Sequence, residues 1–293
     1  MVLAHLSQSS DGAFLWAGFR SIAKLGGAID CFVRETVEGL SPKVRLWLRQ
    51  SDGLESAQLE EARASLEGFE GVPVIATICT RLSPDMSTPD VVLLPLDDDF
   101  FLRGVVPTLN LSLPPWHERE AKLFWRGRCC GERMRIVERL AACSHTNVGF
   151  TDRVSWDHPL KSGWADPAEF ARHKYVFIVD GNAIASSLMW CFALGAVPVL
   201  VTHPQNRYWF QSHLRPFENY VPVSWDLGDF DEVVKWLLTH DVESEAIAEA
   251  ALRLAETLFS PEQQQNYARG ELERAVELGG PVIDSELCAD SEF

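Results

Sequence analysis

A glycine turn and the residues after it are the first group that could bind a phosphorylated ligand. Asp180-Gly181-Asn182 separates two apolar stretches at a point where glycine permits a tight turn and where Asn or Ser can cap a helix. We expect that helix to start within Ala183 to Ser187. The free backbone N–H groups of a helix N-terminus attract an anion such as a diphosphate. The alternative is that the whole segment is only hydrophobic core.

The second group is a local surplus of arginine in an acidic chain. The formal net charge of the whole chain is −16, which disfavours nucleic acid and anionic membranes as partners. Between residues 118 and 139, however, basic side chains outnumber acidic ones. The basic residues are Arg119, Lys122, Arg126, Arg128, Arg133, Arg135 and Arg139. Guanidinium groups suit phosphate recognition, although alternating charges are also typical of a solvated helix face.

Neither a metal centre nor a disulfide framework is expected. The 7 cysteines include no CxxC pair, and scattered thiols of this kind are typical of a reducing, cytosol-like compartment. The 8 histidines include no HxxxH or HExxH arrangement. No apolar run is long enough to span a membrane, and the first residues lack the pattern of a signal peptide. We therefore expect a cytoplasmic protein.

The glycine turn needs strands to hold it, and the sequence predicts a βαβ unit around it. Tyr175 to Val179 is a short apolar run, typical of a strand that is buried on both faces. Apolar residues at helical spacing follow the turn and stop near Gly195, and Val197 to Val201 predicts the next strand. Such strands should be parallel and joined by a right-handed crossover. Ligands bind beyond the carboxyl ends of such strands, which is where Gly181 lies.

The rest of the chain is typical of an α/β protein with two domains. Further strands are expected at 44–48, 72–78, 91–96, 122–125, 148–150 and 220–223. Further helices are expected within 14–40 and at 54–66, 132–143, 230–238, 247–258 and 262–278. We therefore assign residues 1–113 to an N-terminal α/β domain and 114–260 to a Rossmann-like domain. Residues 261–293 would form a helix, which could pack back on the N-terminal domain, and an acidic tail.

Four stretches, in this order, resemble the motifs of one known family. They are Phe124-Trp125-Arg126-Gly127, similar to an (F/W)RG element; His173 to Gly181, similar to a KY strand with its glycine turn; Gly195 to Leu200, similar to a helix stop and strand; and Phe217 to Val223 with Asp226. Over about Lys122 to Phe259 the chain therefore resembles the CAP10-like glycosyltransferases, or glycosyltransferase family 90. That family includes protein O-glucosyltransferases and capsule-associated xylosyltransferases.

The resemblance implies a GT-B fold, in which two Rossmann-like domains face each other across a cleft. The C-terminal domain would hold a UDP-sugar donor and the N-terminal domain a glycan or protein acceptor. The reaction would be an inverting, metal-independent transfer of a glucose- or xylose-class sugar to a hydroxyl, without a cofactor. Cationic side chains and a helix N-terminus would then stabilise the charge on the leaving UDP.

The resemblance also implies which residues contact the donor. They are Arg126, Gly127, Arg133, Arg135, Tyr175, Asp180, Gly181, Ser186 and Ser187. Ser187 stands where many relatives carry an arginine. One diphosphate contact would therefore be missing, or it would come from Arg128 or Arg207.

The catalytic base is less clearly marked by the sequence. An inverting transfer needs a carboxylate that takes the proton of the acceptor hydroxyl. Relatives carry it as an aspartate in a D-x-P turn, but the corresponding stretch here has Pro84 with no aspartate before it. The candidates are Asp85, just after this proline, and Asp98 in the run Asp97 to Asp99, which could instead be a solvated acidic turn.

Two other functions stay open. The chain could be a non-catalytic module that binds glycans or nucleotides and has lost its base. It could also be a GT-B enzyme of another family, similar to fucosyltransferases that use a GDP-sugar, because these also end a donor-domain helix in a G-x-VPV strand. Donor screening with UDP- and GDP-sugars separates the two families.

Overall fold

The structure is a computed structural model that describes residues 108–277 apart from Ala183 and, before them, Pro95 and six strands. These strands are Leu3–Gln8 (β1), Gly12–Ala17 (β2), Val44–Arg49 (β3), Val72–Thr77 (β4), Thr80–Arg81 (β5) and Val91–Leu93 (β6). The chain divides into two compact units. The first comprises Met1–Asp99, Gln205–Ser212 and Pro261–Phe293, and the second comprises Phe100–Pro204 and His213–Ser260.

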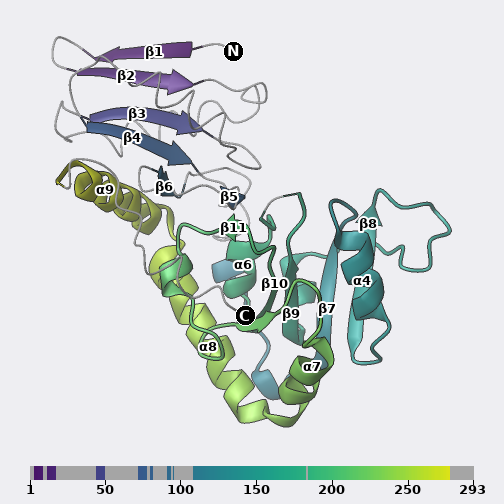
Figure 1. The fold of residues 1–293 in the computed structure, drawn as a ribbon. Helices are drawn as coiled ribbons and strands as arrows, with labels where there is room; N and C mark the ends of the chain where they lie inside the picture. Colours follow the sequence, from purple (N-terminus) through teal and green to yellow (C-terminus); the bar gives the residue numbers. More distant parts are fainter. Residues whose placement is uncertain are drawn as a thin grey trace. The chain divides into compact units, whose positions relative to one another are not determined.

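A five-stranded parallel sheet forms the centre of the second unit (Figure 1). Its strands are Glu120–Arg128 (β7), Thr146–Asp152 (β8), His173–Val179 (β9), Val197–Val201 (β10) and Val221–Val223 (β12). Their spatial order is β12-β10-β9-β7-β8, and every neighbouring pair is parallel. Numbered along the chain from β7, the order reads 2-1-3-4-5, so the winding of the sheet reverses between β7 and β9.

Strands β9 and β10 match the prediction of strands buried on both faces. All residues of β9 and β10 are buried, as expected when helices cover both sides of a parallel sheet. On one face, helices Arg133–Ala141 (α4) and Phe230–Thr239 (α7) pack on alternate strand residues such as Trp125 and Phe177. The shorter helices Pro167–Phe170 (α5) and Leu188–Phe192 (α6) lie on the other face, where Phe170 contacts Phe124 and Trp190.

Two long helices follow the sheet. Asp241–Leu258 (α8) packs against α6 and β10, and Phe259 just after it meets Phe192 edge to face. Pro261–Glu277 (α9) belongs to the first unit, where it contacts β4 and β6. None of the helices in the described residues is both long and apolar enough to cross a bilayer.

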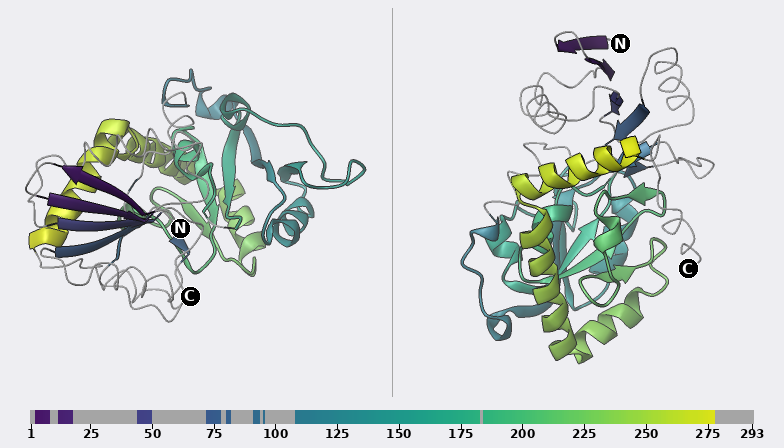
Figure 2. Two further views of the ribbon diagram at one scale, coloured as in Figure 1. Left: turned by 90° about the horizontal axis from the view of Figure 1, so that it is seen from above. Right: turned by 90° about the vertical axis from the view of Figure 1, so that its left-hand side faces the viewer.

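The first unit contains three expected strands and an unexpected hairpin. β3, β4 and β6 match the strands expected at 44–48, 72–78 and 91–96 and form a parallel sheet, and Asn206–Arg207 (β11) pairs with β5. β1 and β2 pair antiparallel, and Figure 2 shows β1 to β4 side by side in its left view. The predicted helical spacing from residue 14 is therefore wrong up to Ala17, because short apolar runs do not distinguish helix from strand. Residues 18–40 and the helix predicted at 54–66 lie outside the described residues.

Candidate functional site

Two glycine turns meet at the carboxyl ends of β7 and β9. A Cβ atom added to Gly131 would lie 2.8 Å from the carbonyl oxygen of Gly181, and one added to Gly181 would lie 2.8 Å from Sγ of Cys130. Gly131 also has a φ of +54°, which L side chains rarely adopt. Glycine at both positions therefore allows the two loops to approach closely. This contact lies where the winding of the sheet reverses, the usual place for a ligand in such folds.

Asp180 ties the glycine turn to the neighbouring strand. Its side chain is 1% exposed, and its two carboxylate oxygens accept hydrogen bonds from the backbone N–H groups of Ala185 at 3.0 Å and His203 at 3.1 Å. The observed role of Asp180 is thus to hold the turn after β9 against the end of β10. Direct contact of this carboxylate with a donor stays a prediction.

The prediction about the start of the following helix is wrong. We expected the helix to begin within Ala183 to Ser187, but α6 begins at Leu188 and has only 5 residues. The Asp180 side chain accepts from the backbone N–H of Ala185, and Ser186 and Ser187 form a turn that precedes the helix. Ser186 is exposed and Ser187 is half-buried at the N-cap position, so their hydroxyls still lie at this edge.

Arg133 lies beneath the glycine turn and is largely occupied by backbone acceptors. Its Nε and Nη2 donate to the carbonyl oxygen of Val179 at 3.1 and 2.6 Å, and its Nη1 donates to that of Arg128 at 3.2 Å. The guanidinium also stands 3.3 Å from a Cβ placed on Gly181. Burial lowers its pKa below the ordinary arginine value. Arg133 therefore joins the loop after β7 to the last carbonyl group of β9.

Two more exposed arginines border this edge. Arg135 donates from Nη2 to the carbonyl oxygen of Trp225, just after β12, at 3.0 Å and pairs with Glu132. Arg128 pairs through Nε with Oδ2 of Asp152 at 3.0 Å. Guanidinium groups thus stand at the carboxyl ends of β7 and near that of β12, on either side of the two glycine turns.

Asp152 is a candidate that the sequence prediction did not include. It is the last residue of β8, and its Oδ1 is buried without a hydrogen-bond partner among the described residues. The available signal was a carboxylate two residues after the strand expected at 148–150, which in the structure extends to Asp152. The carboxylate side chain of Asp152 is 39% exposed, so a turn of the side chain would bring Oδ1 to a ligand near the reversal point of the sheet.

Arg126 lies on the opposite face of the sheet from Arg133. Its guanidinium donates to the backbone and side-chain oxygens of Asn147 at 2.8 and 2.6 Å and stands 4.5 Å from the Phe124 ring centroid. Arg133 instead lies 5.6 Å from the ring of Trp125, and adjacent strand residues point to opposite faces. The structure therefore does not bring Arg126 and Arg133, two predicted donor contacts, together on one face of the sheet. Gly127, the next residue of β7, is half-buried.

Tyr175 lies in the hydrophobic core rather than at the carboxyl edge. Its side chain is 1% exposed, and its hydroxyl donates to the carbonyl oxygen of Leu237 in α7 at 2.6 Å. Burial raises the pKa of this hydroxyl to about 12. Tyr175 thus has an observed packing role, and a donor contact for it stays a prediction.

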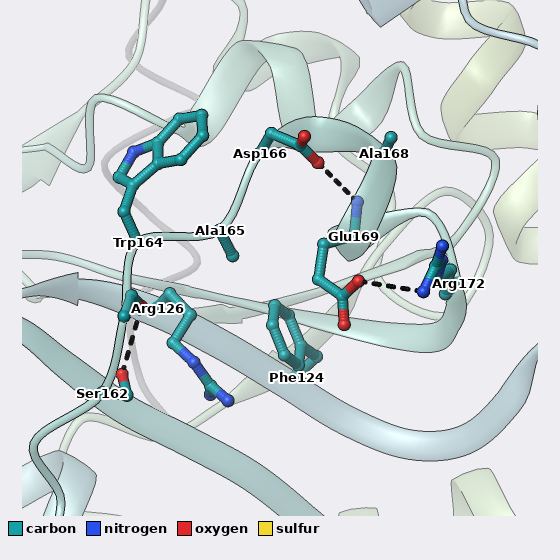
Figure 3. A pocket seen from close by; sticks show the side chains of 10 residues that line it. Phe124, Arg126, Ser162, Trp164, Ala165, Asp166, Ala168, Glu169 and Arg172 are labelled. Carbon is teal, nitrogen blue, oxygen red and sulfur yellow. Dashed lines mark hydrogen bonds and ion pairs between the residues drawn. The ribbon is translucent and has the colours of Figure 1, made fainter.

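Arg126 instead borders an open pocket of about 480 Å³ (Figure 3). The lining residues come from β7 and from the connection between β8 and β9. They are Phe124, Arg126, Ser162, Gly163, Trp164, Ala165, Asp166, Ala168, Glu169 and Arg172.

The candidate bases Asp85 and Asp98 both lie outside the described residues. Within the described part of the chain, no group of three or more His, Cys, Asp or Glu side chains is placed to hold a metal ion.

Comparison with known proteins identifies relatives of the part that contains this site. Residues 108–272 match the family model described as glycosyl transferase family 90. Uncharacterized protein 027R of Frog virus 3 is 28% identical over 188 residues, which covers 52% of this chain and 19% of that protein. Protein O-glucosyltransferase 3 of Mus musculus is 29% identical over 224 residues, covering 70% of this chain and 42% of that protein. The chain thus spans less than half the length of these curated relatives.

Solved structures of two transferases are also similar at low sequence identity. A crystal structure of an α1,3-fucosyltransferase has a TM-score of 0.40 at 12% identity and covers 75% of this chain and 86% of that chain. The spinosyn rhamnosyltransferase SpnG has a TM-score of 0.37 at 11% identity and covers 84% of this chain and 78% of that chain.

Proposed function

The chain belongs to glycosyl transferase family 90, and we propose that it transfers a glucose- or xylose-class sugar from a UDP-sugar to a hydroxyl of a glycan or protein. The family match covers most of the second unit, and the similarity to protein O-glucosyltransferase 3 supports a hydroxyl acceptor. We propose an inverting, metal-independent reaction in a GT-B arrangement. The first unit would carry the acceptor and the second unit the donor.

The donor diphosphate would bind at the carboxyl edge of the sheet, over the turn from Gly181 to Ser187. The observation that carries this proposal is the close contact of Gly131 with Gly181 at the reversal point between β7 and β9. Gly181 itself is buried against Cys130 and Arg133, but Gly131 and Ser186 are exposed at this edge, where a phosphate can approach. In this proposal Gly127 and Gly181 leave room for Trp125 and Cys130 to pack beneath the donor, and the hydroxyls of Ser186 and Ser187 donate to phosphate oxygens.

Arginine side chains would neutralise the charge that develops on the leaving UDP. Arg135 and Arg128 are exposed at this edge, so both can turn toward a diphosphate at the cost of surface ion pairs, which are weak. Arg133 would act differently, because its guanidinium already holds the carbonyl groups beneath the turn. We therefore propose Arg133 as a positioning residue and Arg135 as a direct contact. Arg128 would supply the contact that many relatives make with an arginine at the position of Ser187.

Asp152 would accept a hydrogen bond from the donor's ribose. In Rossmann-type sites an acidic residue after the strand that follows the first glycine turn binds the ribose hydroxyls. β8 is the strand that follows β7 and its loop, and Oδ1 of Asp152 has no partner within the described residues. In this proposal Arg128 leaves Oδ2 of Asp152 to reach the diphosphate, and the half-exposed carboxylate turns so that the buried Oδ1 meets the ribose.

The chemical step would need one carboxylate from the first unit. We propose that Asp85 or Asp98 removes the proton from the acceptor hydroxyl while the hydroxyl oxygen attacks the anomeric carbon from the face opposite UDP. The bond between the anomeric carbon and the diphosphate oxygen breaks in the same step, and UDP leaves with the electron pair.

We also propose a reducing, cytosol-like compartment, which the four free cysteines of the described residues support.

Calorimetric titration with UDP and with GDP tests the donor site directly. We expect UDP to bind and a UDP-sugar to be consumed when an acceptor is present. If neither nucleotide binds to the folded protein, the donor site is wrong. Preference for GDP would favour an enzyme similar to fucosyltransferases, and UDP binding without consumption of any UDP-sugar would favour a non-catalytic binding module.

A further inference from the structure

The pocket beside Arg126 exists because the connection from β8 to β9 contains little helix. Residues 153–172 are all described, and the only helix among them is α5, with 4 residues. A parallel sheet is normally covered by a full helix at such a crossover. Here a loop crosses the face of β7 that carries Phe124 and Arg126, and it leaves an open cavity of about 480 Å³.

The charges around this pocket balance each other. Arg126 and Arg172 face Asp166 and Glu169, so the lining has two cationic and two anionic side chains. Glu169 pairs with Nη1 of Arg172 at 3.3 Å, and Asp166 accepts from the backbone N–H of Glu169 at 2.8 Å. A phosphate would meet repulsion from two carboxylates. A neutral ligand with many hydroxyl groups would find both donors and acceptors.

Arg126 has hydrogen-bonding capacity left for such a ligand. Three of its five N–H groups are used by oxygen atoms of Trp125 and Asn147. Burial lowers the pKa of Arg126, and the negative charge of Glu169 offsets only part of this shift. The guanidinium is therefore held rigidly by β8 while part of it faces the pocket, near the carboxylate of Glu169.

An exposed indole completes the pocket. Trp164 is 77% exposed although it lines the cavity, and Figure 3 shows it across Ala165 from Arg126 and Glu169. Large apolar rings at a protein surface often mark a binding site, and tryptophan combines a flat apolar face with polar surroundings. The C–H face of a pyranose ring can stack on such an indole while its hydroxyl groups reach Glu169 and Arg126.

We propose that this pocket is a saccharide subsite that binds one neutral pyranose ring of a glycan, stacked on Trp164 and hydrogen-bonded to Glu169 and Arg126. The subsite is separate from the proposed donor site, because its lining residues lie on the face of the sheet opposite Arg133. Binding there needs neither UDP nor the catalytic base. The proposal therefore stands or falls independently of the transferase reaction.

NMR of the tryptophan indole N–H groups tests the proposal. The probes are methyl glycosides of glucose, xylose, galactose and N-acetylglucosamine, together with maltotriose and cellotriose, and Trp164→Phe assigns the relevant signal. We expect a saturable millimolar shift of the Trp164 signal with at least one neutral saccharide. Trp164→Ala should weaken the affinity about tenfold or more, and Glu169→Gln should weaken it as well. Thermal unfolding should stay unchanged in Trp164→Ala because the ring is exposed.

Trp156 provides the matched control, since it lies in the same connection, is 89% exposed and does not line the pocket. Trp156→Ala should bind the saccharides as the unchanged protein does. UDP affinity should be equal in Trp164→Ala and the unchanged protein. The proposal is overturned if no saccharide of the panel shifts the Trp164 signal, if Trp164→Ala retains full affinity, or if UDP or inorganic phosphate competes for the same pocket.

Discussion

Single residues at the carboxyl edge differ in what they are free to do. Asp180 and Arg133 have polar side chains of the types that bind donors, yet both are engaged with backbone groups. Asp152 has a carboxylate oxygen without a partner among the described residues. The structure therefore separates side chains that are already engaged with the backbone from one that has an unused acceptor atom.

Replacing Asp152 by asparagine should weaken UDP binding while the fold is kept. The amide has nearly the same shape, but it loses the charge that pairs with Arg128 and one acceptor for the ribose. We expect UDP affinity to fall about tenfold, equivalent to about 1.4 kcal/mol. Calorimetry measures the change, and Asp157→Asn in the adjacent exposed loop is the control. Unchanged affinity in Asp152→Asn would remove Asp152 from the donor site.

Tyr175 should make stability depend on alkaline pH. Its pKa is raised from 10.0 to about 12 in the folded protein, chiefly by burial. The unfolded chain therefore loses this proton first, so the contribution is complete below about pH 10 and is lost as the pH rises to about 12. In denaturation at several pH values, the free energy of unfolding should fall less steeply between pH 10 and 12 in Tyr175→Phe than in the unchanged protein. The difference between the two proteins is the measurement, because burial also raises the pKa of Tyr220. Parallel curves would contradict this account.

At the scale of elements, two short connections decide where ligands can approach. The loop from β7 to α4 and the turn from β9 to α6 are packed together through their glycines. The connection from β8 to β9 replaces a covering helix and leaves the pocket open. The proposed donor and saccharide sites thus both depend on loops that a rigid sheet positions.

Gly131→Ala should destabilise the second unit and disturb the donor site together. The new methyl group would stand 2.8 Å from a backbone oxygen, at a φ of +54°. We expect the free energy of unfolding to fall by about 1–3 kcal/mol, with weaker UDP binding. Gly270→Ala is the contrasting control: it lies inside α9 with nothing within 4 Å of the new Cβ and should stabilise that helix by up to about 1 kcal/mol. Urea denaturation measures both changes in the free energy of unfolding. Equal changes in Gly131→Ala and Gly270→Ala would argue against a close contact at Gly131.

At the scale of the whole molecule, the groups that bind the donor and the catalytic base come from different units in the proposed reaction. The proposed donor site belongs to the second unit, whereas the candidate bases Asp85 and Asp98 are both in the first. If the base is one of them, its loss should stop chemistry without preventing donor binding.

Asp85→Asn and Asp98→Asn test this division. We expect one of them to lower kcat by about 100-fold or more, because general base catalysis contributes about that much. UDP affinity in calorimetry should stay unchanged in both variants, since neither residue contacts the nucleotide in this proposal. Asp97→Asn and Asp99→Asn control for the general loss of acidic charge. Full activity in both Asp85→Asn and Asp98→Asn would place the base elsewhere.

The sequence by itself determined the local elements of the second unit and the family. The strands β9 and β10 and the helices α4 and α7 follow from apolar spacing along the chain, and the motif order identified family 90, which the family model confirms. These features are local, so neighbouring residues specify them. The sequence did not indicate the hairpin of β1 and β2, because its short apolar runs suit either helix or strand.

Only the tertiary structure decided which polar side chains share a site. Arg126 and Arg133 are close in sequence, but they lie on opposite faces because one follows the alternation of β7 and the other starts α4. The order of the strands placed Asp152 beside the glycine turns and buried Asp180 between β9 and β10. Strand order and burial result from packing between distant segments, which no spacing along the chain encodes.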